Sequence, residues 1–403
     1  MSATALPNQA RARRHSLKFL VVGTLLSSLA LYIYLPTLIP YALSRGASLT
    51  LVGVISGSYG FIQVFVRIPL GVLSDHWQRR KWFVVFGAIC GVVSCLALAL
   101  ADDVSAIVVW RAVAGIGGAT HAITATLFAL QFDGAQTQRA MGIFSFSNTL
   151  AFAVGPLLGG LVGAAYGWRA PFLIGAVLGT MGLLMLIAVT EPAAGSRGRS
   201  VKRRELTDVV RRPVIVEAVV LIALLTFAQF VTTFTFIPVG LTRLGAGPDA
   251  VGILQFVTMS CFTLTSLVSG TLVVTRLGSQ RTVGLGVALV GISVLAVPWM
   301  PNPLALTLAQ AASGVGWGLC LPVLWAWALD GVESAAQGTG SAVVHTGGSV
   351  GILVGPIAAG LLAERLGLNP TFLLMGIVCL LAAGWPLTQA THAAEGVGPA
   401  GGA

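Results

Sequence analysis

The chain has 403 residues, of which 56% are hydrophobic and only 9% are charged, and its formal net charge is +10. A soluble globular protein carries about 25% charged residues, so this composition excludes a water-soluble fold. The basic residues gather at the ends of long apolar segments, which indicates membrane topology and excludes a nucleic-acid-binding surface.

Twelve apolar segments follow one another along the chain, and each is long enough to cross a hydrocarbon core of about 30 Å. We therefore predict an all-α integral membrane protein with spans at 18–42, 50–74, 82–101, 104–130, 140–165, 170–190, 213–240, 250–275, 282–300, 304–329, 338–363 and 371–390.

The remaining segments connect or flank these spans. A short basic tail at 1–17 precedes the first span, which we interpret as uncleaved because no small-residue cleavage site follows it. A basic linker at 191–212 separates two six-helix bundles, at 18–190 and 213–390. The Gly- and Ala-rich tail at 391–403 is predicted to be disordered.

The basic residues also predict the orientation in the membrane. With the N-terminus in the cytoplasm, seventeen Lys and Arg residues fall on the inner side, four fall on the outer side, and Arg67 and Arg111 lie within the membrane. Cytoplasmic loops carry the excess of Lys and Arg, so both termini are predicted to be cytoplasmic and the location to be the plasma or inner membrane. The five cysteines lack metal-ligand spacing, so neither a metal site nor a disulfide framework is predicted.

The sequence contains two motifs of interest, and the first is a candidate for conformational control. The loop between the second and third spans reads GVLSDHWQRRK from Gly71, with Asp75, Arg79 and Arg80 among its polar residues. The glycine permits close helix packing, and an acid is favoured beside a helix N-terminus. Asp133, at the end of the fourth span, is a candidate partner for Arg79. The alternative is that this loop only sets the topology.

The second motif lies in the fifth span and consists of Gly155, Pro156, Gly159 and Gly160, where proline bends the helix and the glycines permit tight packing. The two halves of the chain also repeat each other. Seven residues recur 200 positions later without a gap, namely Gly155, Pro156, Gly160, Leu161, Gly167, Phe172 and Leu173, so that Gly355 and Pro356 repeat the motif. Such a repeat indicates two pseudo-symmetric halves.

The loop at Gly71 resembles the signature G-x-L-[AS]-D-[RK]-x-G-R-[RK]-[RK] of the major facilitator superfamily, although His76 and Gln78 depart from it. The fifth span resembles the motif of the drug:proton antiporter branch, although Ala151 stands where a glycine is usual. The resemblance implies twelve helices in two bundles, with Asp75 contacting the start of the eleventh span. It also implies that such polar contacts form in one conformation and break in the other. Packing alone is the alternative role for the glycine-proline motif.

Embedded charged or titratable residues are candidates for substrate binding or proton transfer. Arg111 lies about 10 Å into the fourth span at 1.5 Å per residue, a depth at which charge is costly, and either a functional role or snorkelling to the outer surface would explain it. Arg67 either pairs with an acid of a neighbouring helix or acts in substrate binding or gating. His121 and His345 titrate near neutral pH, and Glu217 begins the seventh span. For these three residues, proton transfer competes with a structural role.

The substrate cavity is predicted from polar and aromatic residues within the spans, in the helices that the resemblance places around it. The candidates are Tyr32, Tyr34, Asn148, Gln229, Phe234, Gln255, Gln310, Trp317 and Trp325. Since no Asp or Glu lies at mid-depth, a cationic substrate would lack a counter-charge. The expected substrate is therefore a small amphipathic, aromatic compound that is neutral or anionic.

These observations predict a secondary active transporter that exports such a compound by proton antiport through alternating access. Its energy source would be the proton gradient, with no cofactor, and a monomer would suffice. The alternative is a proton symporter or uniporter that imports a sugar or an organic anion. The sequence has no GxxxxGK[ST] motif and no nucleophile–base set, so neither a fused ATPase nor another enzyme is expected.

Overall fold

The structure is a computed structural model that describes residues 7–132, 136–191, 212–330 and 337–395. Within these ranges it is all-helical, and twelve helices are long and apolar enough to cross a membrane. The predicted all-α fold with twelve spans is thereby confirmed, and the membrane-crossing helices begin and end close to the predicted spans. The cytoplasmic location of both termini stays a prediction.

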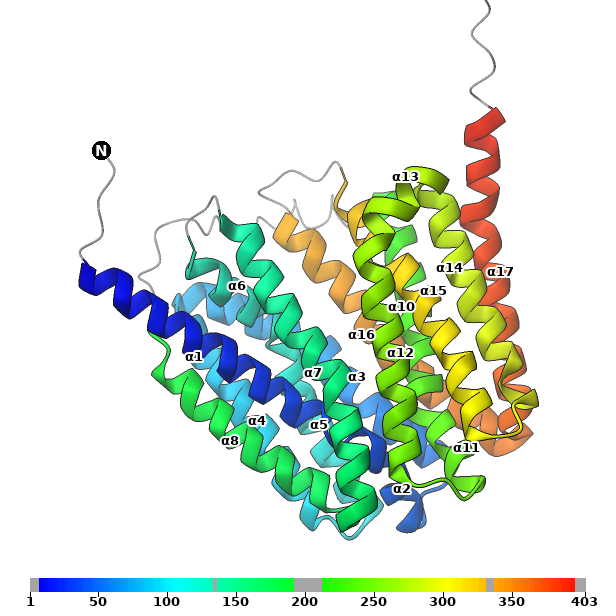
Figure 1. The fold of residues 1–403 in the computed structure, drawn as a ribbon, viewed down its shortest axis with the longest axis horizontal. Helices are drawn as coiled ribbons and strands as arrows, with labels where there is room; N and C mark the ends of the chain where they lie inside the picture. Colours follow the sequence, from blue (N-terminus) through cyan, green and yellow to red (C-terminus); the bar gives the residue numbers. More distant parts are fainter. Residues whose placement is uncertain (1–6, 133–135, 192–211, 331–336, 396–403) are drawn as a thin grey trace, which may run out of the picture. The chain divides into compact units, whose positions relative to one another are not determined.

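The first half of the chain forms eight helical elements, because two of its six spans consist of two pieces (Figure 1). They are α1 (Pro7–Tyr32), α2 (Leu35–Ser44), α3 (Leu49–Trp77), α4 (Arg80–Leu100), α5 (Val104–Ala119), α6 (His121–Leu130), α7 (Thr137–Tyr166) and α8 (Ala170–Ala188).

The second half follows the same order of spans, with π-helical turns in two of them. Its elements are α10 (Pro213–Gln229), η2 (Phe230–Phe236), α11 (Ile237–Arg243), α12 (Pro248–Val268), η3 (Ser269–Val273), α13 (Val274–Leu277), α14 (Ser279–Ala296), η4 (Val297–Trp299), α15 (Pro303–Leu329), α16 (Gln337–Leu366) and α17 (Leu368–Glu395).

Two helices extend into segments predicted as tails. Helix α1 begins at Pro7, well before residue 18, because proline is favourable at the first helical position and the Ala and Arg residues that follow are good helix formers. Helix α17 continues to Glu395, past the predicted end at 390, through a segment without Gly or Pro. Of the predicted linker at 191–212, only Glu191 and Arg212 belong to the described residues.

The chain divides into two compact units. Unit 1 comprises residues 1–47, 58–200 and 247–252, and unit 2 comprises residues 48–57, 201–246 and 253–403. In unit 1, α8 packs against both α1 and α4. In unit 2, α14 packs against α15 and α17, and α10 packs against α16. Each unit thus supplies its own helical core.

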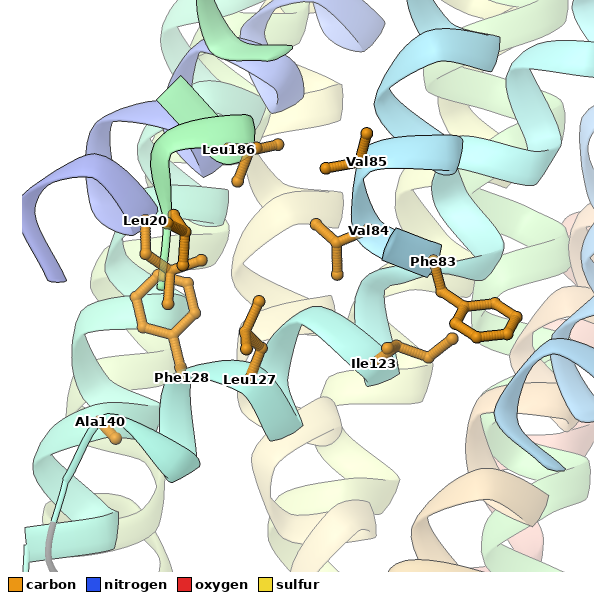
Figure 2. Packing of buried hydrophobic residues seen from close by; sticks show 10 residues of the cluster. Leu20, Phe83, Val84, Val85, Ile123, Leu127, Phe128, Ala140 and Leu186 are labelled. Carbon is orange, nitrogen blue, oxygen red and sulfur yellow. The ribbon is translucent and has the colours of Figure 1, made fainter. Parts of the chain in front are cut away.

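An apolar cluster lies at one end of unit 1, where α4 begins and α6 and α8 end. We call this the loop end of unit 1. Figure 2 shows the side chains of the cluster, contributed by α1, α4, α6, α7 and α8, namely Leu20, Phe83, Val84, Val85, Ile123, Leu127, Phe128, Ala140 and Leu186. All are buried, and Leu20 and Phe128 are fully covered. Dispersion contacts of this kind, together with small residues, hold helices together where lipid is as apolar as the side chains.

Glycines create the closest helix crossings, and the two sequence repeats build the same crossing. In unit 1, a Cβ atom added to Gly252 would lie 2.6 Å from the carbonyl oxygen of Pro156 and 3.0 Å from the Cα of Gly160. In unit 2, a Cβ atom on Gly53 would meet the carbonyl oxygen of Pro356 and lie 3.2 Å from the Cα of Gly360. Since those neighbours are backbone atoms, any side chain must push the helices apart.

The crossings predict opposite effects for one substitution at different glycines. Alanine is favoured over glycine by about 1 kcal/mol in a helix interior, but overpacking costs about 1–3 kcal/mol. We expect Gly53→Ala and Gly252→Ala to lower the melting temperature of the purified protein. Gly142→Ala is the matched control, because a Cβ atom on Gly142 would have no neighbour within 4 Å, and it should be neutral or stabilising. Equal melting temperatures for all three variants would contradict the crossings.

Candidate functional site

Arg111 lies inside unit 1, held by two tyrosines. Its Nη1 donates a hydrogen bond of 2.7 Å to the hydroxyl of Tyr34, and its Cζ lies 4.2 Å from the ring centroid of Tyr59. The side chain is buried and makes no ion pair with any described carboxylate. The π faces of the tyrosines and the Tyr34 hydroxyl therefore compensate its charge. The guanidinium does not reach the surface, so the snorkelling alternative is wrong.

Local backbone features bring these groups together. The span containing Tyr34 breaks between α1 and α2, ahead of Leu35-Pro36, where proline suits the start of a helix. On α5, a Cβ atom on Gly115 would lie 2.6 Å from the carbonyl oxygen of Tyr59, and one on Gly118 would meet the Tyr59 hydroxyl. The glycines of α5 thus allow α3 to approach until Tyr59 covers Arg111.

Arg67 lies on the same face of α3 as Tyr59, eight residues further along the helix. Its Nη2 donates hydrogen bonds to Oε1 of Gln63 and, at 3.5 Å, to the carbonyl oxygen of Gly118. Its Nε is buried without a partner. The ion pair with an acid of a neighbouring helix, one of the two predicted roles, is not formed within the described residues. We call Tyr34, Tyr59, Gln63, Arg67 and Arg111 the cationic cluster.

Two members of the cationic cluster were missed from the sequence. Tyr59, Gln63 and Arg67 are spaced by four residues, so they lie on one face of a helix. The spacing was a usable signal, because a tyrosine and a glutamine in line with an embedded arginine offer it a π face and an amide oxygen.

The titratable candidates occupy different places. His121 begins α6, directly after a break at Thr120, and the positive charge of Arg67 acts on its imidazole. In unit 2, the His345 ring packs edge-on against Trp325, with 4.5 Å between the ring centroids. Glu217 lines a pocket of about 510 Å³ where α10 begins and α15 ends, together with Arg281 and other residues. His121 is the one of these three candidates that lies in unit 1 with the cationic cluster.

Unit 2 carries a buried neutral network around Thr233. The Thr233 hydroxyl accepts a hydrogen bond of 3.0 Å from Nε2 of Gln229 and donates one of 2.8 Å to Oε1 of Gln310. Gln255 donates through Nε2 to the carbonyl oxygen of Thr233, also at 3.0 Å. We call these four residues the amide network. Three of them were predicted as cavity candidates, and Thr233, presented by the π-helical turn η2, was missed.

The amide network leaves hydrogen-bonding capacity unused. Oε1 of Gln255, Nε2 of Gln310 and, two turns further along α15, Nε1 of Trp317 are buried without a partner. Buried polar atoms are nearly always hydrogen-bonded in native proteins, and exceptions call for an explanation such as a ligand or water. The network thus offers both donors and acceptors without a formal charge.

The other predicted cavity residues make local contacts. Tyr32 packs on Phe152 and Phe234 packs on Phe230, with centroid distances of 4.7 Å and 5.2 Å. Asn148 accepts a hydrogen bond of 3.1 Å from the Ser28 hydroxyl through Oδ1. Trp317 packs on Phe262 at 4.3 Å. A role in substrate contact stays a prediction for each of them.

The loop motif forms part of a polar assembly at the start of α4. Asp75 pairs with Arg80 at 2.8 Å. Glu191, which the sequence analysis did not single out, accepts hydrogen bonds from the backbone N–H groups of Arg80 and Lys81 at 2.8 Å and 3.1 Å. Arg79 is exposed, and its predicted partner Asp133 lies outside the described residues. A carboxylate at this helix N-terminus is electrostatically favourable.

The glycine-proline motif contributes packing. Gly155 and Gly159 face the end of α1 at Tyr32 and Ile33, and Gly160 faces the start of α12 at Pro248 and Gly252. In unit 2, a Cβ atom on Gly355 would lie 3.1 Å from Phe227. The antiporter role implied for this motif stays a prediction. Within the described residues, no group of three or more His, Cys, Asp or Glu residues is placed to hold a metal ion.

Comparison with known proteins places this geometry in a family. The family model of the Major Facilitator Superfamily matches residues 20–344 and 241–401. The inner membrane transport protein YajR of Escherichia coli K12 is 33% identical over 171 residues, which are 42% of this chain and 37% of YajR. The purine ribonucleoside efflux pump NepI of Shigella dysenteriae is 26% identical over 362 residues, 86% of this chain and 87% of the pump.

Solved structures agree on the fold. A mutant of the nucleoside transporter NupG superposes with a TM-score of 0.73 over 93% of this chain and 99% of that one, at 14% identity, which shows the fold alone. With twelve helices able to span a membrane and relatives named as transport proteins, the chain is a multi-pass cell-membrane protein and not an enzyme. It belongs to the Major Facilitator Superfamily of membrane transporters.

Proposed function

We propose that this protein exports a small, aromatic, neutral or anionic compound by proton antiport through alternating access, with the proton gradient as its energy source. The observation that carries the proposal is the cationic cluster, in which two arginines lie within membrane-spanning helices with no carboxylate partner among the described residues. Embedded ionisable residues are costly in a membrane and mark substrate or ion pathways.

The charge of the cationic cluster favours one substrate class. The partners of Arg67 and Arg111 are hydroxyl, amide, carbonyl and aromatic groups, which only partly neutralise the two positive charges. A cationic substrate would be repelled, whereas an anionic group or an electron-rich aromatic ring would be attracted. The amide network adds neutral donors and acceptors of the kind that a polar aromatic compound requires.

The relatives support export. NepI, which aligns over most of both chains, is named a purine ribonucleoside efflux pump. Purine ribonucleosides are neutral and aromatic and carry several hydrogen-bonding groups, so they fall in the substrate class that the charge and the amide network favour. They are therefore the first compounds to test.

Proton coupling is assigned to His121. Histidine is a common proton carrier in proteins, and His121 follows three residues after Gly118, whose carbonyl oxygen accepts a hydrogen bond from Arg67. Binding of a substrate beside Arg67 and protonation of His121 would then influence each other, which is the coupling that exchange requires. Glu217 and His345 are the competing candidates.

The proposed direction is tested with purified protein in liposomes that contain a pH-sensitive dye. A gradient of a purine ribonucleoside or an aromatic acid should drive protons opposite to the substrate, and a lipophilic cation should drive none. Protons that move with the substrate would instead favour the alternative of an organic-anion importer, for which the two arginines would also be suitable. Substrate flux without proton movement would indicate a uniporter.

The cationic cluster predicts which variants lose transport. We expect Arg67→Gln and Arg111→Gln to lower the transport rate at least about tenfold, the effect of losing a charge-assisted hydrogen bond of about 1.5 kcal/mol. Arg111→Lys should also fail, because lysine cannot both stack on Tyr59 and donate in a fixed direction to Tyr34. Arg276→Gln, at the exposed end of α13, is the control. Unchanged transport in both glutamine variants would remove the basis of the proposal.

The proton carrier is identified by comparing three variants in the same liposomes. His121→Gln should abolish substrate-driven proton movement and the dependence of the transport rate on pH. Glu217→Gln and His345→Gln should keep both. Loss of coupling in one of the latter variants, with His121→Gln still coupled, would transfer the assignment to that residue.

A further inference from the structure

A small cavity lies in unit 1 beside His121. Its volume is about 40 Å³, and it is lined by α1, α4, α8 and the junction of α5 and α6. Glycines on three of these elements, Gly87, Gly117 and Gly179, contribute to its wall. Thr24, Ser27 and Ser28 face it from α1, and Thr120, His121 and Thr124 face it from the α5–α6 junction. Its wall is mostly apolar but includes six polar side chains from two places in the chain.

Two hydroxyls in this wall lack a partner. Oγ1 of Thr24 and Oγ of Ser27 are buried and make no hydrogen bond, and the Thr24 side chain is only 4% exposed. Serine and threonine within helices commonly bond the carbonyl four residues earlier, as Thr124 does with Thr120 at 3.0 Å. Leaving a buried polar group unsatisfied costs about 1–3 kcal/mol, so two such groups in one cavity point to a missing bonding partner.

The neighbouring polar groups do not supply that partner. Ser28 donates to Asn148, and Thr120 donates to the carbonyl oxygen of Gly117 at 2.8 Å. The His121 imidazole makes no hydrogen bond to any residue that the structure describes. The cavity thus brings together two unused hydroxyls and an imidazole with unused nitrogen atoms.

The size of the cavity and the charge around it determine which ligand it can hold. A solute pocket has a volume of about 300–1,000 Å³, whereas a water molecule needs roughly 10–15 Å³ and two to four polar partners. A metal cation is disfavoured because no carboxylate lines the cavity and Arg67 acts on His121 from nearby. We propose that this cavity is a water-binding site, in which one or two water molecules hydrogen-bond Thr24, Ser27 and His121.

The site is bordered by the apolar cluster of Figure 2. Val84 and Leu186 belong to both the cluster and the wall of the cavity. We propose this water as a structural component of unit 1. It links α1 to α6 across the break at Thr120. On the proposed function, it positions the imidazole that carries the proton.

The water itself is tested without substrate or proton gradient. Water-edited solid-state NMR on labelled protein in liposomes should show magnetisation transfer from water to Thr24 and His121. The double variant Thr24→Val/Ser27→Ala should reduce transfer to His121 at least about threefold, because too few polar partners remain to hold water. Thr24→Ser should retain the transfer. Thr126→Val is the control, since Thr126 is exposed on the same helix as His121 and bonds Ala122 at 3.0 Å.

The outcomes separate the water site from the proposed function. Transfer to Thr24 and His121 no greater than to the methyl groups of Val84 would show a dry cavity and overturn the proposal, as would unchanged transfer to His121 in a folded double variant. If transfer is lost while the number of protons moved per substrate stays the same, the water site stands and its positioning role is overturned. A wild-type protein that holds the water but moves no protons would refute only the antiport mechanism.

Discussion

The placement of two arginine side chains in membrane-spanning helices, Arg111 buried and Arg67 half-buried, is the constraint on which unit 1 depends. A guanidinium cannot be left bare in a low-dielectric interior, and no described carboxylate is present to neutralise it. The compensation comes from a tyrosine hydroxyl, two aromatic faces, an amide oxygen and a backbone carbonyl. The break between α1 and α2 and the glycines of α5 are needed because they bring those groups within reach.

The two halves of the chain repeat each other in sequence, but the polar groups buried in the two units differ. Unit 1 concentrates positive charge at Arg67 and Arg111, whereas the amide network of unit 2 is neutral and leaves donors and acceptors unused. The positions that the repeat preserves most clearly are glycines and prolines, such as Gly160 and Gly360. These residues govern how closely helices approach. Packing is therefore shared by the repeats, while the buried polar groups differ between them.

In unit 1, the apolar cluster and the proposed water site lie next to each other. The cluster around Phe128 fills the loop end, and the cavity beside Thr24 is left unfilled where glycines replace larger side chains. A dry cavity of that size would leave the hydroxyls of Thr24 and Ser27 without hydrogen bonds. On our proposal, bound water satisfies these hydroxyls and the imidazole of His121 together. The break at Thr120 presents the histidine at this position.

Sequence alone determined that the protein lies in a lipid bilayer, how many spans it has and which family it resembles. These follow from hydropathy, segment length and the loop motif, which are local properties of the chain. It also identified Arg67, Arg111 and His121 as embedded polar residues, and it identified the three glutamines of the amide network. It did not reveal the roles of Tyr59, Gln63, Thr233 and Glu191. Partners of buried groups depend on how helices cross, and only the tertiary structure decided that Arg67 bonds an amide and a carbonyl, that Arg111 is enclosed by tyrosines, and that a cavity lies beside His121.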